Sequence, residues 1–550
     1  MRNDSGLGSR ALGGNMASQL TGSEVIFSDD FSTNGPIDSA KWHYNVWTPP
    51  DGGGSHYGNT QQRQSLPVAS NGVMRLQLDS FNPTDPNHTS FVGSEAITNR
   101  LFDLGNGPIA FEARVRYEQD QRGIIGGFFT FAGPPQNHDE IDFEAMSNRF
   151  NEMQTNIYHN EPLGEGHPIS YPISGSLADF HTYRIEWLPN MVRWLIDGQV
   201  VRTETNLVPD KAMALHFNIW APPASWPTGD SSLRPAASQA QNQLFFFDVD
   251  DVKVEKIAAL AGDASHNTLL GSAAHEYIDG GDGDDRLIGG GGNDVLEGGS
   301  GNDTAVYTAA ASSFAISARA GEHILSVADR TGGEGVDTLS NVENAEFDGQ
   351  TIDLTSMLAA ANLNAADFAP IISLYNAYFD RAPDALGLFF WAAQHANGMS
   401  LEDLAQRFYD SAEAAGSRPA GQSVTYAVTQ AYFDILGRAP DSEGLNFWVR
   451  MIETGQLAPS DFALALIQSA GGQAGEDGQI VKTKASLSAY YALEHGLNDG
   501  GDAASVLDAP NLYAGRALVD GYAAAAESGE TMQLVTRLLG ISMADHAAIA

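Results

Sequence analysis

HDEIDFEAMSN, from His138 to Asn148, is the most informative stretch of this 550-residue chain. Glu140, Asp142 and Glu144 occupy alternate positions in it, and apolar residues separate them. Because successive side chains of a β-strand point to opposite faces, the pattern predicts a strand with three carboxylates on one face and an apolar layer behind it. Crowded carboxylates repel one another, so the arrangement favours chemistry in which one carboxyl stays protonated while another is ionised. The alternative is a solvated polar face.

The surrounding residues, 24–257, have a sequence pattern typical of an all-β domain. Short runs alternate apolar and polar residues, as in GVMRLQLDS (72–80), FEARVRYE (111–118) and MVRWLIDGQVV (191–201), and turn signals such as NG and DG separate them. Many short strands in about 230 residues predict a β-sandwich or jelly roll.

A nine-residue repeat follows. From Gly280 the chain reads GGDGDDRLI, GGGGNDVLE and GGSGNDTAV, three copies of the frame GGxGxDx(apolar)x, and two weaker copies begin at Gly262 and Gly271. Glycines permit tight turns with positive φ, and turn carbonyls together with the sixth-position Asp offer the oxygen ligands that calcium prefers. A flexible Gly/Asp-rich linker is the alternative, but a linker has no reason to keep this frame.

The repeats resemble those of secreted RTX proteins, which form a short parallel β-roll, and we assign the roll to residues 262–306. The expected calcium ligands are three sixth-position carboxylates and six turn glycines: Asp285, Asp294, Asp303, Gly281, Gly283, Gly290, Gly292, Gly299 and Gly301. Asp250, in the preceding domain, is a further candidate ligand for a structural calcium ion.

The rest of the chain is predicted to be a β-structured cap and linker (307–361), a helical repeat domain (362–484) and a helical tail (485–550). YFDRAPDALGLFFW (378–391) is echoed by YFDILGRAPDSEGLNFW (432–448), with Asp384 and Asp441 near expected helix N-caps. This repeat resembles a domain of unknown function found in bacterial secreted proteins. Trp391 and Trp448 are expected in its core, and sugar binding or docking to the cell surface is the alternative.

Composition narrows the class of partner. With 29 basic and 69 acidic residues, the net charge of −40 disfavours nucleic acid and anionic membranes as partners. Residues 24–257 carry 29 acidic and 15 basic residues, a net of −14, and residues 258–550 carry a net of −27. The absence of cysteine excludes disulfides and thiolate sites. We also expect no membrane span, a flexible leader (1–23) without a cleavable signal peptide, and a monomer.

The carboxylate stretch resembles glycoside hydrolase family sixteen, in its lichenase and succinoglycan-glycanase-like branch. Its E-x-D-x-E signature is Glu140-Ile-Asp142-Phe-Glu144, and GFFTFAGPP, HTYRIEWLPNMVRWLIDG and LHFNIW fit the same branch. The resemblance implies a concanavalin-like jelly roll and retaining hydrolysis, with Glu140 as nucleophile, Glu144 as general acid/base and Asp142 as the assisting carboxylate. Retention requires carboxyl groups about 5–5.5 Å apart. Cα atoms four residues apart on a strand are about 13 Å apart, so both glutamates must lean inward.

The resemblance also implies a sugar-binding surface. We expect the following residues to contact substrate: Glu95, His138, Gln154, Asn156, Tyr158, Asn218 and Trp220. Two positions depart from the lichenase pattern, because His138 stands where Trp is usual and Ile97 where Arg is usual. Both departures change the expected cleft without touching the three carboxylates.

Taken together, the sequence predicts a secreted, extracellular endo-β-glycanase with structural Ca²⁺ and no catalytic cofactor. The RTX resemblance implies export by a type I secretion apparatus that reads a C-terminal signal in residues 485–550. Candidate substrates are a bacterial exopolysaccharide such as succinoglycan, or a β-glucan. The alternative is a catalytically inactive carbohydrate-binding or RTX cell-surface matrix protein.

Overall fold

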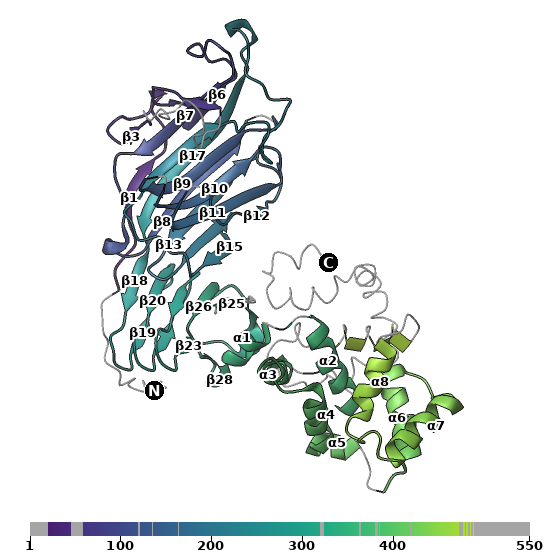
Figure 1. Cartoon of the computed structure of the whole chain (residues 1–550). Helices are drawn as coiled ribbons and strands as arrows, with labels where there is room; N and C mark the ends of the chain where they lie inside the picture. The colour runs from purple at the N-terminus through teal and green to yellow at the C-terminus, as the bar shows by residue number, and fades with distance from the viewer. Residues whose placement is uncertain are drawn as a thin grey trace, which may run out of the picture. The chain divides into compact units, whose positions relative to one another are not determined.

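The computed structural model describes residues 20–45 and 59–488, apart from short gaps at 119–120, 135, 163, 319–323, 330, 362, 364, 380–382, 384, 418–420, 472–476, 479, 482–483 and 486–487. They form two compact units, Thr21–Ala259 and the chain from Leu260 onward. The predicted order of jelly roll, β-roll and helical region is confirmed (Figure 1). Asp384 and most of the predicted leader and secretion tail lie outside the described residues.

The first unit is built from two β-layers joined in one 17-stranded sheet, almost wholly antiparallel. One layer, which we call the carboxylate layer, contains in spatial order β3 (Trp42–His43), β7 (Phe91–Thr98), β16 (Ala214–Trp220), β9 (Ile125–Ala132), β10 (His138–Met146), β11 (Glu152–Glu161) and β12 (Ile169–Pro172).

The second layer, the backing layer, consists of β1 (Glu24–Asp29), β2 (Gly35–Pro36), β4 (Thr60–Gln62), β5 (Val68–Ser70), β6 (Val73–Asp79), β8 (Ile109–Tyr117), β13 (His181–Trp187), β14 (Val192–Ile196), β15 (Gln199–Glu204) and β17 (Leu244–Lys256). Two short 3₁₀ turns, η1 (Leu104–Asn106) and η2 (Gln239–Gln241), lie in the connections.

Strand alternation places the core between the layers. On β6 the side chains of Met74, Leu76 and Leu78 are fully buried, and those between them are only partly buried. Ile141 and Phe143 of β10 are buried in the same core. A fully buried side chain of this kind contributes about 1.5–3 kcal/mol to folding, so the face that each strand buries is strongly fixed.

An aromatic stack and one hydrogen bond link β10 to this core. The ring of Phe128 stacks on Phe143 at 6.1 Å and on Phe217 at 5.3 Å between centroids. The indole Nε1 of Trp194, on β14 of the backing layer, donates to the backbone oxygen of Asp142 at 2.9 Å. The strand that bears the carboxylates is therefore held from behind by packing and by a buried hydrogen bond.

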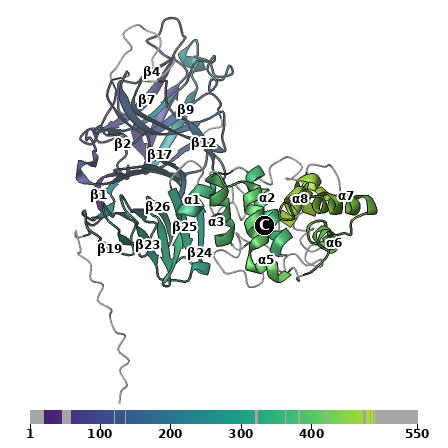
Figure 2. The ribbon, with the colours of Figure 1, turned by 60° about the horizontal axis from the view of Figure 1, so that its bottom comes forward.

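The second unit begins with a parallel β-roll. One sheet has the order β18 (Ala258–Ala261), β20 (Glu276–Asp279), β22 (Val295–Glu297), β26 (Val336–Ser340), β25 (Ile324–Asp329) and β24 (Phe314–Ala318). The other has β19 (Thr268–Leu270), β21 (Arg286–Ile288), β23 (Thr304–Tyr307), β27 (Asn344–Phe347) and β28 (Gln350–Asp353) (Figure 2). A 3₁₀ turn, η3 (Ala311–Ser313), precedes β24.

The parallel pairing continues beyond the residues that we assigned to the roll. β26 adds to β22 and β27 adds to β23, both in parallel. β25 then pairs antiparallel with β26 and β24 with β25, while β28 pairs antiparallel with β27, so that β24 and β28 end the two sheets. The segment expected to be a cap therefore supplies two further strands of the stacks as well as their ends.

Helices follow from α1 (Thr355–Ala361), which begins before the predicted helical region. The remaining helices are α2 (Ala365–Phe379), α3 (Ala385–Ala396), α4 (Leu401–Asp410), α5 (Ala412–Ser417), α6 (Val424–Leu436), α7 (Ser442–Glu453) and α8 (Phe462–Gly471). Among the described residues, none of these helices is long and apolar enough to cross a membrane.

The repeated motifs contribute a helix N-cap and aromatic residues that pack against the hydrophobic core. The predicted N-cap of α7 is confirmed, because Asp441 accepts a hydrogen bond from the Gly444 backbone at 2.7 Å. Trp391 packs against Phe408 at 5.2 Å between ring centroids, and Trp448 packs against Phe462 at 5.4 Å. Both tryptophans lie against the hydrophobic core, as expected for structural residues.

Candidate active site and calcium-binding coils

The three carboxylates of β10 share the face of the carboxylate layer that points away from the core. They alternate with Ile141 and Phe143, whose side chains are 0% and 1% exposed. Antiparallel pairing with β9 and β11 places Glu140 between Phe131 and Tyr158. The sequence spacing alone thus predicts correctly which face carries the carboxylates.

Each carboxylate belongs to a row of cross-strand neighbours that extends across the carboxylate layer. Asp142 lies between Phe129 and Asn156, and Glu144 lies between Gly127 and Gln154. The row of Glu144 continues through Asn218 of β16 to Glu95 of β7. The predicted sugar-contacting residues of four strands are therefore brought onto one face with the carboxylates, although their contact with substrate stays a prediction.

Gly127 provides room beside Glu144. A Cβ atom at this position would lie 2.6 Å from the Asn218 Oδ1 atom and 3.1 Å from the Phe129 ring, closer than side chains tolerate. The Gly127 backbone N–H also donates to Asn218 Oδ1 at 3.1 Å. Glycine at this point leaves room for the Asn218 amide and the Phe129 ring in the row beside Glu144.

The three carboxyl groups differ in environment. Asp142 is 2% exposed, and burial, followed by the negative charges of Glu140 and Glu144, raises its pKa well above the usual range. Burial and the charge of Glu140 raise the pKa of Glu144 to about 7. The Glu140 side chain is 15% exposed. One face therefore holds a carboxyl whose pKa is raised well above its usual range and another that titrates near neutrality.

His138 contacts Glu140 directly. Its Nε2 atom lies 3.0 Å from Glu140 Oε2, and the imidazole is 0% exposed. The ring stacks on Phe131 at 5.3 Å between centroids and lies 4.4 Å from the ring of Tyr158. A substrate contact by His138 stays a prediction, but the contact that the structure records is with a carboxylate.

The roll presents its own buried carboxylates. The backbone N–H of Asp285 donates to Asp303 Oδ1 at 2.8 Å, and the N–H of Asn267 donates to Asp285 Oδ1 at 2.6 Å. The second carboxyl oxygens of Asp285 and Asp303 are buried without a hydrogen-bond donor. Burial raises the pKa of Asp303 to about 6. Such buried, unpartnered oxygen atoms suit a divalent cation, so the residues fit calcium.

Comparisons with known proteins agree with both sites. Residues 53–235 match the family model for glycosyl hydrolases family 16. Residues 270–305 match the model of the RTX calcium-binding nonapeptide repeat, and residues 355–418 match a domain of unknown function, DUF4214. The three resemblances predicted from sequence are confirmed. The matches support a glycoside hydrolase of the β-glycanase type with calcium-binding repeats.

Two curated relatives and one solved structure align with about a third to two fifths of this chain. Over 181 residues the chain is 29% identical to a beta-glucanase of Bacillus amyloliquefaciens, with 32% of this chain and 70% of that protein aligned. Over 200 residues it is 28% identical to an endo-1,3-1,4-beta-glycanase of Rhizobium meliloti, with 35% and 68% aligned. The solved beta-glucanase of Bacillus licheniformis aligns with 43% of this chain and 99% of its own, at 23% identity and a TM-score of 0.34.

Sequence reasoning missed one histidine of the first unit. The Nδ1 atom of His216 lies 3.1 Å from Glu95 Oε1, and its ring stacks on Phe129 at 4.8 Å between centroids. His216 lies two residues before Asn218 in LHFNIW, so the same alternation rule places it on the carboxylate face. It connects Glu95 to the row that contains Asp142.

Two tryptophans lie at one end of the carboxylate face. Trp220 is 8% exposed and packs with Ile125 and Met146, whereas Trp226 is 41% exposed. Their rings meet edge to face at 6.1 Å. The exposed ring of Trp226 is the one with a free surface on which a sugar can stack.

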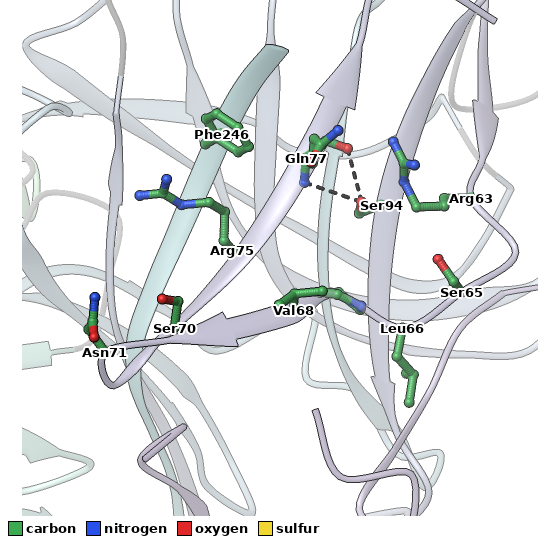
Figure 3. A pocket seen from close by; sticks show the side chains of 11 residues that line it. Arg63, Ser65, Leu66, Val68, Ser70, Asn71, Arg75, Gln77, Ser94 and Phe246 are labelled. Atoms are coloured by element: carbon green, nitrogen blue, oxygen red, sulfur yellow. Dashed lines mark hydrogen bonds between the residues drawn. The ribbon is translucent and has the colours of Figure 1, made fainter. Parts of the chain in front are cut away.

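A hollow of about 580 Å³ lies elsewhere, on the backing layer (Figure 3). Arg75 and Gln77 line it from β6, on the side of that strand opposite its buried residues. Its two arginines are already paired, Arg63 with Asp79 and Arg75 with Asp248. Because this surface faces away from the core on the other layer, the hollow is separate from the carboxylates.

Two acidic groups of the first unit already have cationic partners. Asp250, a candidate calcium ligand, forms an ion pair with Arg114, and its metal role stays a prediction. Asp139 lies close to His159 and Asp210 in a potential metal-binding group. However, Asp139 accepts hydrogen bonds from the backbone N–H groups of Asn160, Asp210 and Lys211, and from the Lys211 ammonium at 3.1 Å. This network anchors the loop between β15 and β16.

We expect calcium to protect the roll from proteolysis. In chelator the crowded carboxylates repel one another, and a bound cation that recognises only the folded roll stabilises it by mass action. Cleavage of the full chain within residues 262–347 should slow at least about tenfold when calcium is added, as measured by limited proteolysis with mass spectrometry. Magnesium at the same ionic strength is the control. Equal cleavage in calcium and chelator would contradict the assignment of the coils.

Proposed function

We propose that the chain is a secreted, retaining endo-β-glycanase that cleaves a neutral β-glucan. The observation that carries the proposal is that the three carboxyl groups on β10 have different environments. Asp142 is buried with a raised pKa, Glu144 has a pKa of about 7, and Glu140 is partly exposed beside His138. Retaining hydrolysis requires an ionised nucleophile and a protonated acid on one face of the sugar chain.

The two chemical steps follow from this set. The Glu140 carboxylate attacks the anomeric carbon, and the bond to the leaving sugar oxygen breaks while Glu144 donates its proton to that oxygen. Water then attacks the glycosyl-enzyme ester, Glu144 removes a proton from that water, and the ester bond to Glu140 breaks. Asp142 shares its proton with Glu140, which stabilises the carboxylate that is released in the second step.

The charge of the carboxylate layer bears on the substrate. None of its seven strands, all within the described residues, contains a lysine or an arginine. Because the hydrolase unit is also net acidic, an anionic polymer such as succinoglycan would be repelled, whereas a neutral glucan would not. The aligned relatives are named beta-glucanase and endo-1,3-1,4-beta-glycanase, which agrees with a neutral β-glucan.

The experiment that tests this proposal is product analysis on lichenan, laminarin, succinoglycan and agarose. We expect lichenan or laminarin to be cut internally and succinoglycan to be cut more slowly. Preference for succinoglycan would overturn the argument from charge without affecting the assignment of the carboxylates.

The second unit is proposed to serve export and folding outside the cell. RTX-type repeats are typical of proteins that leave the cell by type I secretion and fold when they meet millimolar calcium. The helical region, matched to a domain of unknown function, has an assigned structural core and no assigned chemistry. We propose that it contributes to placement on cells or on polymer, not to catalysis.

Substitution of either glutamate tests the roles. Glu140→Gln and Glu144→Gln should fold normally but lose activity, because each removes an ionisable oxygen that the chemistry needs. We expect at least about 10²–10⁴-fold loss in kcat for Glu144→Gln and a larger loss for Glu140→Gln. Glu152→Gln, at the partly exposed start of β11, is the matched control. Near-normal turnover by both variants would refute the proposal.

The pH profile tests the environment of Glu144. An acid with a pKa raised to about 7 is protonated below that pH and loses its proton above it. The rate constant kcat/KM should therefore fall about tenfold per pH unit above pH 7, and this limb should be missing from the residual activity of Glu144→Gln. A decline that begins near pH 4.5, the ordinary range of a glutamate, would contradict the assignment.

His138 is expected to stabilise the ionised form of Glu140. The imidazole Nε2 atom lies 3.0 Å from Glu140 Oε2, and we expect this nitrogen, when it carries a proton, to interact with that carboxylate. His138→Phe keeps a ring between Phe131 and Tyr158 but removes the donor, so we expect kcat to fall about 10–100-fold with little change in KM. His138→Gln, which retains an N–H donor, should recover part of the loss. His43→Phe, at the layer edge, is the control.

The outcome that would contradict this role is a purely binding effect. If His138→Phe raises KM and leaves kcat unchanged, the histidine contacts substrate rather than the carboxylate.

A further inference from the structure

The nonapeptide frame recurs after an inserted hairpin. Beyond β23 the chain forms β24 and β25, and then reads GGEGVDTLS from Gly332 to Ser340. This stretch fits the frame GGxGxDx(apolar)x at each position, with Asp337 sixth and Leu339 eighth. It lies outside the 270–305 segment that matches the repeat model.

The structure places this frame as one more coil of the roll. β26 pairs with β22 in parallel, so that Leu339 lies opposite Leu296 and is 1% exposed. The backbone N–H of Thr338 donates to Asp294 O at 2.8 Å, as the N–H of Thr304 donates to Asp285 O at 2.9 Å. β26 and β25 lie side by side in Figure 2.

The carboxylate of the new coil is linked as the others are. The Asp294 N–H donates to Asp337 Oδ1 at 2.9 Å, which repeats the 2.8 Å bond from the Asp285 N–H to Asp303 Oδ1. Asp337 is 1% exposed. Gly335 approaches the preceding coil so closely that a Cβ atom there would lie 1.7 Å from the oxygen of Gly292. The close stacking of coils is thus preserved across the insertion.

The other edge of the roll ends on a glutamate. β27 pairs with β23 in parallel, with Ala345 opposite Ala305. Glu343 Oε2 accepts a hydrogen bond from the Asp303 N–H at 2.8 Å, the place that a sixth-position aspartate takes in the earlier coils. Asp303 itself is 0% exposed, and its Oδ2 atom has no hydrogen-bond donor. This orphaned oxygen therefore lies next to a coil whose carboxylate is Glu343.

We propose that Asp337 and Glu343 are calcium ligands, and that the calcium-binding array extends past the inserted hairpin to the last coil of each edge. Asp294 and Asp337 would serve one cation, and Asp303 and Glu343 another. This inference rests on the proposed calcium role of the roll and adds ligands that the repeat frames before Val306 do not contain.

The position of these ligands has a consequence for the hairpin. Asp294 and Asp303 precede β24 and β25 in the chain, whereas Asp337 and Glu343 follow them. A cation shared across this insertion holds the two ends of the intervening hairpin together in the folded roll, and it stabilises that state by mass action. Calcium should thereby order the strands that end the sheet as well as the coils.

Calcium stoichiometry of the full chain tests the proposal. We would measure bound calcium by equilibrium dialysis for the wild type and for Asp337→Asn, Glu343→Gln and Asp303→Asn. Asn and Gln keep the oxygen that accepts the backbone hydrogen bond, so the coils should still form. Asp348→Asn, an exposed turn residue of the same unit, is the control for the loss of one negative charge.

We expect Asp337→Asn and Glu343→Gln each to bind about one calcium ion fewer than the wild type, and Asp348→Asn to bind the wild-type number. Hydrogen exchange should show that calcium protects residues 314–318 and 324–329 in the wild type and less so in Asp337→Asn. Full stoichiometry in both Asp337→Asn and Glu343→Gln, together with a loss in Asp303→Asn, would overturn the inference but leave the calcium roll intact. A wild type that binds no calcium would overturn the calcium role itself.

Discussion

Repulsion among the three carboxylates of β10 is the constraint on which the hydrolase unit depends. Three acidic side chains on one face of a strand destabilise it unless the strand is held from behind and the charges are reduced. The core supplies the first condition through the stack of Phe128, Phe143 and Phe217. Burial supplies the second, because it raises the pKa of Asp142 well above its usual range and brings the pKa of Glu144 to about 7. The same crowding then yields one ionised and one protonated group, the pair that retaining hydrolysis needs.

Acidic crowding is resolved differently in the roll. On the carboxylate face, burial raises the pKa of Asp142 and of Glu144, and His138 contacts Glu140. In the roll, the carboxyl oxygens of Asp285 and Asp303 are buried without a donor, so a divalent cation is the natural counter-charge. One arrangement keeps protons available for chemistry, and the other links folding to calcium. Both explain why so acidic a chain can still form well-packed units.

Simple periodicity predicted much of this structure. The alternation in HDEIDFEAMSN assigned the face of the carboxylates, and the nine-residue frame predicted parallel stacking. What the sequence could not show were contacts set by register between distant strands, such as His216 with Glu95 or Trp194 with the backbone of Asp142. The hairpin of β24 and β25 separates the frame that begins at Gly332 from the uninterrupted array. The parallel pairing of β26 with β22 is what shows that this frame belongs to the roll. The ion pair of Asp250 with Arg114 likewise could not be predicted, because the two residues are far apart in the sequence.

The central claim is that Glu140 forms a covalent bond with the sugar during turnover. The most direct measurement is mass spectrometry of the enzyme after reaction with a 2-deoxy-2-fluoro β-glycoside matched to the polysaccharide that it cleaves, which slows hydrolysis of the ester intermediate. The account predicts a single label, mapped to the peptide that contains Glu140 and released when the intermediate turns over. A label on another residue, or first products with inverted anomeric configuration, would contradict it.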